Sequence, residues 1–215
     1  MPNEEHTNLD IEKFLEETAP KVDATIERYI PRKFSKKEVL FKVNPPLYSY
    51  NLEPLNKAIA EPIWDMLDRG GKRWRPALFL LICDALGKKE DYCLDFSIIP
   101  EVIHNGTLVI DDIEDSSEVR RGKPCAYKIY GNDIAINAGN AMYYLPLLPL
   151  MVNKNRLPSE AQRDIYEIYV QEMINLSMGQ AMDITWHRGI ANADTLSEQD
   201  YLQMCAYKTG TLARM

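Results

Sequence analysis

The chain is poor in the features that mark disulfide-rich, membrane-spanning or nucleic-acid-binding proteins. Its four cysteines show no CxxC spacing and no histidine-rich context, which argues against a disulfide framework or a zinc finger. The longest strongly apolar stretch, residues 142–152, is too short for a bilayer span, and residues 1–14 lack the order of a signal peptide. The 25 Lys and Arg against 32 Asp and Glu give a net charge of -7. We therefore expect no nucleic-acid partner, no membrane span and a cytoplasmic location.

Helical periodicity dominates the sequence, and strand-like alternation is scarce. With 215 residues, 46% of them apolar, the chain can bury a full core. Residues 31–52 contain three prolines and predict an irregular connection. The predicted helices are 9–29 (interrupted near Pro20), 53–67, 76–86, 94–118, 133–150 (bent by its prolines), 160–186 (capped by Ser159) and a last helix capped by Ser197. We expect a single all-α domain over residues 1–215.

Four carboxylates lie within five residues at positions 111–115, directly after an apolar run. Asp111 and Asp115 share one helix face, where like charges repel unless a cation joins them. A hard divalent cation such as Mg²⁺ takes carboxylate oxygens and keeps positions for water and phosphate. Downstream, Arg120 and Arg121 carry planar guanidinium groups that grip diphosphate. The alternative is a solvated acidic helix turn, which these basic neighbours disfavour.

A second basic segment, residues 70–76 (GGKRWRP), lies between two predicted helices. Its glycines allow a sharp turn, and the following helix N-terminus offers free N–H groups to an anion. Lys72 and Arg75 are three residues apart and can converge on one ligand. The segment lacks the spacing of a nucleotide-binding P-loop, and its alternative is a helix break with solvated basic residues.

Further polar residues lie at helical spacing elsewhere in the chain. His104 precedes the first aspartate by seven residues, two helical turns, and so faces the same side unless it is a structural histidine. Gln180 and Asp183 share a face of the long predicted helix. Lys208 and Thr209 add a cation and a hydroxyl, unless the lysine only ends a glycine-capped helix. The carboxylates and the anion-binding residues together indicate diphosphate chemistry on a helical scaffold.

These motifs, in this order, resemble the trans-isoprenyl diphosphate synthases (polyprenyl synthetases). The segments that carry the resemblance are 70–76 (GGKRWRP), 104–124 (HNGTLVIDDIEDSSEVRRGKP), 136–144 (INAGNAMYY), 179–183 (GQAMD) and 207–210 (YKTG). DDIED fits the DDxxD pattern of that family, and RRGKP fits its usual sequel. A class I terpene cyclase shares a DDxxD-type motif but would not be expected to carry the two basic motifs. The resemblance implies a helical bundle, usually dimeric, around a deep apolar cavity.

The resemblance also implies an activity, a cofactor and roles for individual residues. The activity is condensation of isopentenyl diphosphate with an allylic diphosphate: the allylic C–O bond ionises, the isopentenyl double bond attacks the carbocation, and a proton is lost. Mg²⁺ would be held by Asp111 and Asp115. The residues given a catalytic role are Asp111, Asp112, Asp115 and Lys208. Isopentenyl diphosphate would bind Lys72, Arg75, His104 and Arg121, and the allylic diphosphate would contact Arg120, Lys208, Thr209 and Gln180.

Small residues before the acidic cluster bear on product length. In this family, bulky residues four and five positions before the first aspartate form a floor that stops chain growth. Here those positions hold Thr107 and Gly106, both small. We therefore expect a product of C20 (geranylgeranyl diphosphate) or longer rather than C15, and we expect Gly106→Phe to shorten it.

Family members are longer than this chain and carry a second aspartate-rich motif after the segment that matches residues 207–210. No second DDxxD occurs in the 215 residues, so we expect a C-terminally incomplete bundle. The chain is then a fragment, a subunit completed by another chain, or a non-catalytic relative. The second candidate function is a regulatory subunit that binds diphosphates and needs a partner. The third is a helical interaction protein with relic motifs, which clustered carboxylates disfavour.

Overall fold

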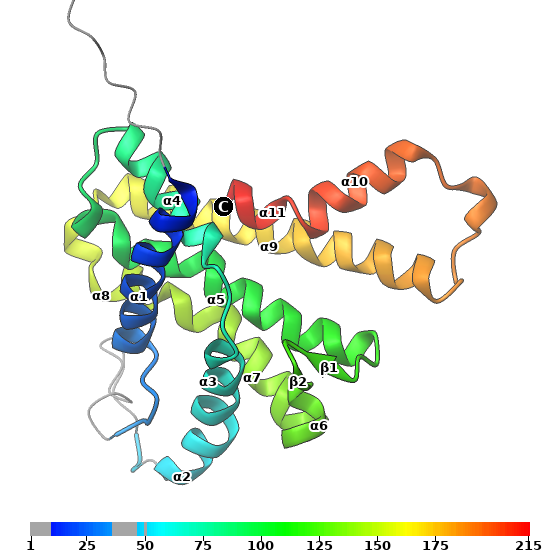
Figure 1. Ribbon diagram of the computed structural model, residues 1–215, viewed down its shortest axis with the longest axis horizontal. Coiled ribbons are helices and arrows are strands. Elements are labelled where there is room, and N and C mark those ends of the chain that lie inside the picture. Colours follow the sequence, from blue (N-terminus) through cyan, green and yellow to red (C-terminus); the bar gives the residue numbers. More distant parts are fainter. Residues whose placement is uncertain (1–9, 36–46, 50) are drawn as a thin grey trace, which may run out of the picture.

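The computed structural model of the protein describes residues 10–35, 47–49 and 51–215. Helices make up most of this part, which confirms the all-α class (Figure 1). A short antiparallel pair, β1 (Val119–Arg120) and β2 (Lys123–Pro124), follows the acidic cluster. The helices are α1 (Ile11–Tyr29), α2 (Leu52–Leu55), α3 (Glu61–Asp68), α4 (Trp74–Ala85), α5 (Glu90–Glu114), α6 (Ala126–Tyr130), α7 (Asn132–Tyr144), α8 (Leu148–Val152), α9 (Ser159–His187), α10 (Glu198–Lys208) and α11 (Thr211–Arg214).

Several helix boundaries differ from the predicted ones. Helix α1 continues through Pro20 instead of breaking there. A π-helical segment, Asn56–Ala60, joins α2 to α3 within the predicted helix 53–67. Helix α5 begins and ends about four residues earlier than predicted. It ends early because Ser116 takes a left-handed conformation (φ 53°). Of the predicted connection, residues 31–35 and 47–49 form no helix or strand, and residues 36–46 lie outside the described part.

One of the two predicted helix caps is confirmed and the other is wrong. Ser197 accepts a hydrogen bond from the backbone N–H of Asp200, whose side chain accepts in return from Ser197, so the two form a capping box. Ser159 instead occupies the first helical position of α9. Pro158 precedes it and fixes the extended backbone from which that helix starts.

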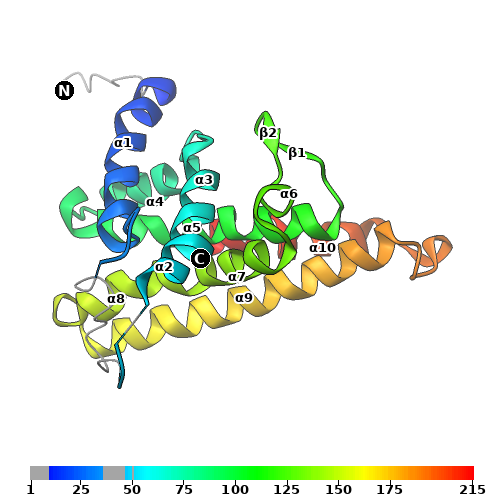
Figure 2. The same ribbon diagram turned by 90° about the horizontal axis from the view of Figure 1, so that it is seen from below.

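Helix α5 is the central element, and helices α1, α3, α4, α6, α7, α8 and α11 contact it (Figures 1 and 2). Its length and apolar composition would suffice to cross a membrane, but 72% of its most apolar window is buried within the protein, as in a core helix. One core cluster joins α5 to α1, α3 and α7, and a second joins it to α8, α9 and α11. The largest fully buried side chains include Ile26, Ile30, Ile63, Leu67, Ile98, Ile103, Met142 and Leu150.

Two glycines set the helix spacing around the candidate site. Gly106 on α5 contacts α7, where an added Cβ would lie 2.8 Å from Cβ of Met142. Gly179 on α9 contacts α10, and an added Cβ would lie 2.4 Å from the backbone N of Lys208. Helix α10 runs back along α9 and extends with it away from the bundle, as Figure 1 shows. The close approach at Gly179 brings the end of α10 toward the end of α5.

Candidate active site

An acidic group, defined as Asp111, Glu114, Asp115 and Asp183, comes together from α5 and α9. One Asp111 oxygen (Oδ1) accepts a hydrogen bond from Nε2 of Gln180 at 2.9 Å and one from Nζ of Lys208 at 3.1 Å. The same ammonium group of Lys208 donates to Asp183. The structure therefore brings four predicted site residues from three helices, α5, α9 and α10, into direct contact.

Two carboxyl groups of the acidic group, Glu114 and Asp115, have raised pKa values. Partial burial, followed by the charges of Asp111 and Asp115, raises the pKa of Glu114. Burial and then the charge of Asp111 raise the pKa of Asp115. Burial lowers the pKa of Lys208, but its hydrogen bonds to Asp183 and Asp111 outweigh this and the pKa is raised overall. The group thus has an excess of negative charge that a cation would relieve.

Asp112 differs from its neighbours because it is buried and paired. Its Oδ1 accepts a hydrogen bond from Nε of Arg120 at 2.9 Å, and only 2% of its side chain is exposed. This pair fixes Arg120, on strand β1, against the end of α5. The predicted contact of Arg120 with the allylic diphosphate, and the catalytic role of Asp112, remain predictions.

A basic group, defined as Arg73, Arg75, His104 and Arg121, lies around the turn before α4. Nη1 of Arg121 donates to the backbone O of Gly70 and to Oδ1 of Asn105, the latter at 3.2 Å. Burial and the guanidinium groups of Arg75 and Arg121 lower the pKa of His104 to about 3. The imidazole is therefore neutral at physiological pH, and three of the predicted anion-binding residues lie together.

Arg75 has a buried hydrogen-bond donor that is not used within the described part of the chain. The guanidinium of Arg75 lies 4.5 Å over the ring of Trp74, and burial lowers its pKa. Its Nε atom is buried and has no hydrogen-bond partner among the described residues. A buried, unpaired donor is unfavourable unless a ligand or water meets it. Lys72 is exposed, as is Thr209, which follows α10.

Sequence reasoning missed Arg73, Glu101 and Asn105. Arg73 is buried and donates to Glu101 Oε1 at 3.0 Å and to Asp23 Oδ1 at 2.8 Å. Glu101 and Asn105 are also buried, on an apolar stretch of α5. Charged and amide residues inside an apolar helix usually have a polar partner, and this signal was present in the sequence.

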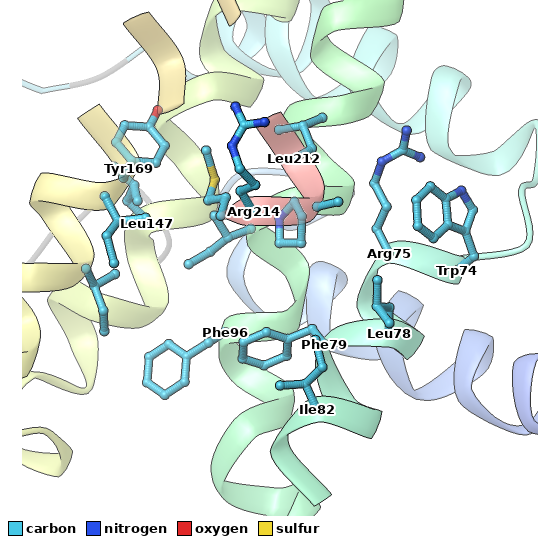
Figure 3. Close-up of a pocket in the computed structure, with 16 residues that line it drawn as sticks. Trp74, Arg75, Leu78, Phe79, Ile82, Phe96, Leu147, Tyr169, Leu212 and Arg214 are labelled. Atoms are coloured by element: carbon cyan, nitrogen blue, oxygen red, sulfur yellow. The ribbon is translucent and has the colours of Figure 1, made fainter. Parts of the chain in front are cut away.

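Two cavities border the site. One, of about 310 Å³, lies among α5, α7 and α9 beneath the acidic group and has an apolar lining. It is lined by Thr107, Ile110, Glu114, Tyr143, Met173, Leu176, Ser177, Gln180, Ala181 and Ile184. The other, of about 340 Å³, extends from Trp74 and Arg75 along apolar side chains such as Phe79 and Phe96 to α11 (Figure 3).

The two positions predicted to set product length lie in different surroundings, and their role stays a prediction. Thr107 lines the smaller cavity, whereas Gly106 is buried against α7. A side chain at position 106 would collide with Met142 and the backbone of Gly139 before it reached the cavity. That Gly106→Phe shortens the product stays a prediction, and these contacts lead us to expect that the same change separates α5 from α7.

The acidic group fits a divalent cation that also binds ligand oxygens. Among the described residues, no cluster of three or more His, Cys, Asp or Glu side chains is arranged to enclose a metal. Asp111 and Asp115 supply two hard oxygen donors from one helix turn, and Mg²⁺ commonly binds one or two carboxylates together with water and phosphate. Lys208 already places a positive charge between Asp111 and Asp183. The donor chemistry thus fits Mg²⁺ held jointly with a diphosphate.

Comparisons with known proteins place the chain among prenyl diphosphate synthases. The polyprenyl synthetase family model matches residues 56–215. A geranylgeranyl pyrophosphate synthase from Eremothecium gossypii is 32% identical over 176 residues, covering 80% of this chain and 52% of the relative. One from Dictyostelium discoideum is 34% identical over 168 residues, covering 78% and 52%.

A solved structure shares the fold. The geranylgeranyl pyrophosphate synthetase of Geoglobus acetivorans superposes with a TM-score of 0.74 at 27% identity, over 93% of this chain and 56% of that one. The chain thus spans about half the length of the relatives that it matches.

Proposed function

The chain belongs to the polyprenyl synthetase family, and from this premise we propose that it takes part in condensing isopentenyl diphosphate with an allylic diphosphate. The observation that carries the proposal is that an acidic group and a basic group both border α5, which contributes Asp111 and Glu114 to the first and His104 to the second. One group suits a diphosphate held through a cation, and the other suits a diphosphate held directly. Two anionic substrates account for both.

In the proposed reaction the acidic group receives the allylic diphosphate. Mg²⁺, when bound, would supply positive charge that stabilises the departing diphosphate. Asp111 and Asp115 would hold it, while Lys208 and Gln180, which both donate to Asp111, would contact the same diphosphate. Arg120 and Thr209 are proposed as further contacts. These donors stabilise negative charge on the leaving group as the allylic C–O bond breaks.

The basic group would receive isopentenyl diphosphate. Arg121 and Arg75 supply guanidinium forks, and the unpaired Nε of Arg75 gains a partner on binding. Neutral His104 contributes a hydrogen bond, and exposed Lys72 adds charge. This arrangement orients the isopentenyl double bond toward the carbon that loses diphosphate.

The apolar cavity beneath the acidic group would hold the growing chain and exclude water from the carbocation. Thr107 is a small residue in its wall, which supports a product of C20 or longer. We expect Thr107→Phe to shorten the product of the extending enzyme, whereas Thr107→Ser should leave its length unchanged. Chromatography of labelled products measures both.

Extension of geranyl or farnesyl diphosphate with labelled isopentenyl diphosphate tests the proposal. Labelled C20 or longer product, from the chain alone or with a second chain, supports it. Diphosphate binding without extension in any combination would favour the second candidate, a regulatory subunit. We also propose that the chain forms one domain, is cytoplasmic, and associates as a homodimer or with a completing chain. Light scattering measures the association.

A further inference from the structure

Arg121 is held by a fully buried amide. Its Nη1 donates to Oδ1 of Asn105 at 3.2 Å, and Nδ2 of Asn105 donates to the Glu101 carboxylate at 3.0 Å and to the Glu101 backbone O at 2.8 Å. A carboxylate paired with an arginine only accepts hydrogen bonds, so the amide nitrogen of Asn105 must face it. Glu101 therefore turns the amide oxygen toward Arg121.

Glu101 is itself fixed by Arg73. The two side chains are 3.0 Å apart and are 4% and 3% exposed, so they form a buried ion pair. Arg73 also donates to Asp23 of α1 at 2.8 Å and to the backbone O of Leu67 of α3 at 2.9 Å. A continuous set of contacts thus runs from α1 and α3 through α5 to Arg121.

The same contacts treat the neighbouring guanidinium groups of Arg73 and Arg121 differently. An added Cβ at Gly71 would lie 3.2 Å from Nη1 of Arg73 and 3.5 Å from Nη2 of Arg121, so both guanidinium groups border this glycine. Arg73 pairs with the Glu101 carboxylate, whereas Arg121 receives the neutral oxygen of an amide. The charge of Arg121 is therefore left for an anionic ligand, although its direction is fixed.

Arg121 needs this support because of its backbone. Its φ of 51° lies in the left-handed region, which non-glycine residues rarely adopt. Such a conformation persists when surrounding contacts determine it. In isolation, the turn between β1 and β2 would allow the guanidinium many orientations.

We propose that Asn105 and Glu101 are positioning residues that aim Arg121 at the diphosphate of isopentenyl diphosphate. Asn105 supplies the side-chain contact with Arg121, beside the contact with the backbone O of Gly70, and Glu101 sets the orientation of the amide. The inference rests on the proposed function of Arg121, and it makes the affinity for one of the two substrates depend on buried residues that touch neither.

Titration calorimetry of isopentenyl diphosphate into the full chain tests the inference. Asn105→Leu keeps the size of the side chain and removes all three of its hydrogen bonds, two to Glu101 and one from Arg121. We expect its affinity for isopentenyl diphosphate to fall about tenfold, the effect of one charge-assisted hydrogen bond. Its affinity for farnesyl diphosphate with Mg²⁺ should remain within about twofold, because that ligand binds the acidic group.

A double-mutant cycle identifies the residue through which Asn105 acts. Arg121→Ala should lose isopentenyl diphosphate affinity, and adding Asn105→Leu to it should cause no further loss. A purely structural role would instead reduce both ligand affinities and would add to Arg121→Ala. If Asn105→Leu does not fold, Asn105→Ser, whose hydroxyl is too short to reach both partners, carries the same prediction.

The outcomes separate this inference from the proposed function. Equal affinity, or no binding, for the unmodified chain and Arg121→Ala would overturn both. Loss of binding in Arg121→Ala together with unchanged binding in the position-105 variant would overturn the positioning role alone. Additive losses in the double variant would also contradict it.

Discussion

The basic and acidic groups of the site differ in how their charge is balanced. In the basic group, buried Glu101 pairs with Arg73 and helices α1, α3 and α5 contribute to the network. In the acidic group, the carboxylates lie at the ends of α5 and α9, and Lys208 is the ammonium group that joins them. One half of the site is thus arranged before any ligand binds, whereas the other has unbalanced charge that a cation would complete.

The largest expected effect comes from removing the buried cation of the basic group. Arg73→Ala leaves Glu101 buried without its partner, which typically costs about 3–5 kcal/mol in the free energy of unfolding. Urea denaturation followed by circular dichroism measures the loss. The neighbouring Lys72→Ala, at an exposed position, should change stability by less than about 0.5 kcal/mol. A loss below about 1 kcal/mol for Arg73→Ala would contradict a fixed basic group.

In the acidic half, the next largest effect is expected from disrupting the close approach of α9 and α10. Gly179→Ala places a Cβ 2.4 Å from the backbone N of Lys208, so the helices must move apart. We expect a loss of about 1–3 kcal/mol in unfolding free energy, as for other overpacked contacts. Ser177→Ala, at an exposed position of the same helix, is the matched control. Equal stability of the two variants would show that this contact does not position Lys208.

Removing one carboxylate of the acidic group tests whether the two groups bind different substrates. Asp111→Asn keeps the shape of the side chain but removes a charge that Lys208 and the proposed cation share. Mg²⁺-dependent affinity for farnesyl diphosphate should fall at least about tenfold, while affinity for isopentenyl diphosphate should be unchanged. Asp164→Asn, on the exposed face of α9, serves as the control. Equal losses for both substrates would mean that the two groups do not bind separately.

The pH dependence of stability separates the groups further. Burial and nearby arginines lower the pKa of His104 to about 3, so the unfolded chain binds the proton more tightly. Stability should therefore be lost as the pH falls below the ordinary histidine pKa of about 6.5. His104→Gln should flatten this part of the urea-denaturation profile, and exposed His187→Gln should not. An unchanged slope for His104→Gln would contradict the burial of a neutral imidazole.

The smallest effect is expected at Asp115. Burial and the charge of Asp111 raise its pKa in the folded chain, so ionisation costs stability as the pH rises through that range. Asp115→Asn removes this cost and should raise the free energy of unfolding at pH 7 by at most about 1 kcal/mol, because the side chain is largely exposed, and the unfolding temperature should rise slightly with it. Added Mg²⁺ should raise the unfolding temperature of the unmodified chain and should do so less in the variant. A lower temperature for Asp115→Asn would contradict the account.

Local pattern was enough to predict the helices and most of the charged site. The spacing of Asp111 and Asp115, and of Gln180 and Asp183, follows from helix geometry and placed each pair on one face. Helix ends were less predictable, since α5 ends where Ser116 adopts a left-handed backbone that depends on the following turn.

Contacts between distant segments could not be predicted from local pattern. Arg73 looked like a solvated neighbour of Lys72, yet it is buried because Asp23 and Glu101, far away in the sequence, pair with it. The absence of a side chain at Gly106 indicated open space beneath the site, but residues of α7 occupy that space. The burial of Arg73 and the packing of Gly106 both depend on which helices lie side by side, and residue spacing along the chain does not encode that arrangement directly.

Calorimetry of both substrates, with Mg²⁺ and with EDTA, tests the central claim most directly. We predict that the unmodified chain binds isopentenyl diphosphate under both conditions, because the basic group is already arranged. We predict that farnesyl diphosphate binds only with Mg²⁺, because the acidic group repels a diphosphate until a cation joins them. Mg²⁺-independent binding of farnesyl diphosphate, or loss of isopentenyl diphosphate binding in EDTA, would contradict it.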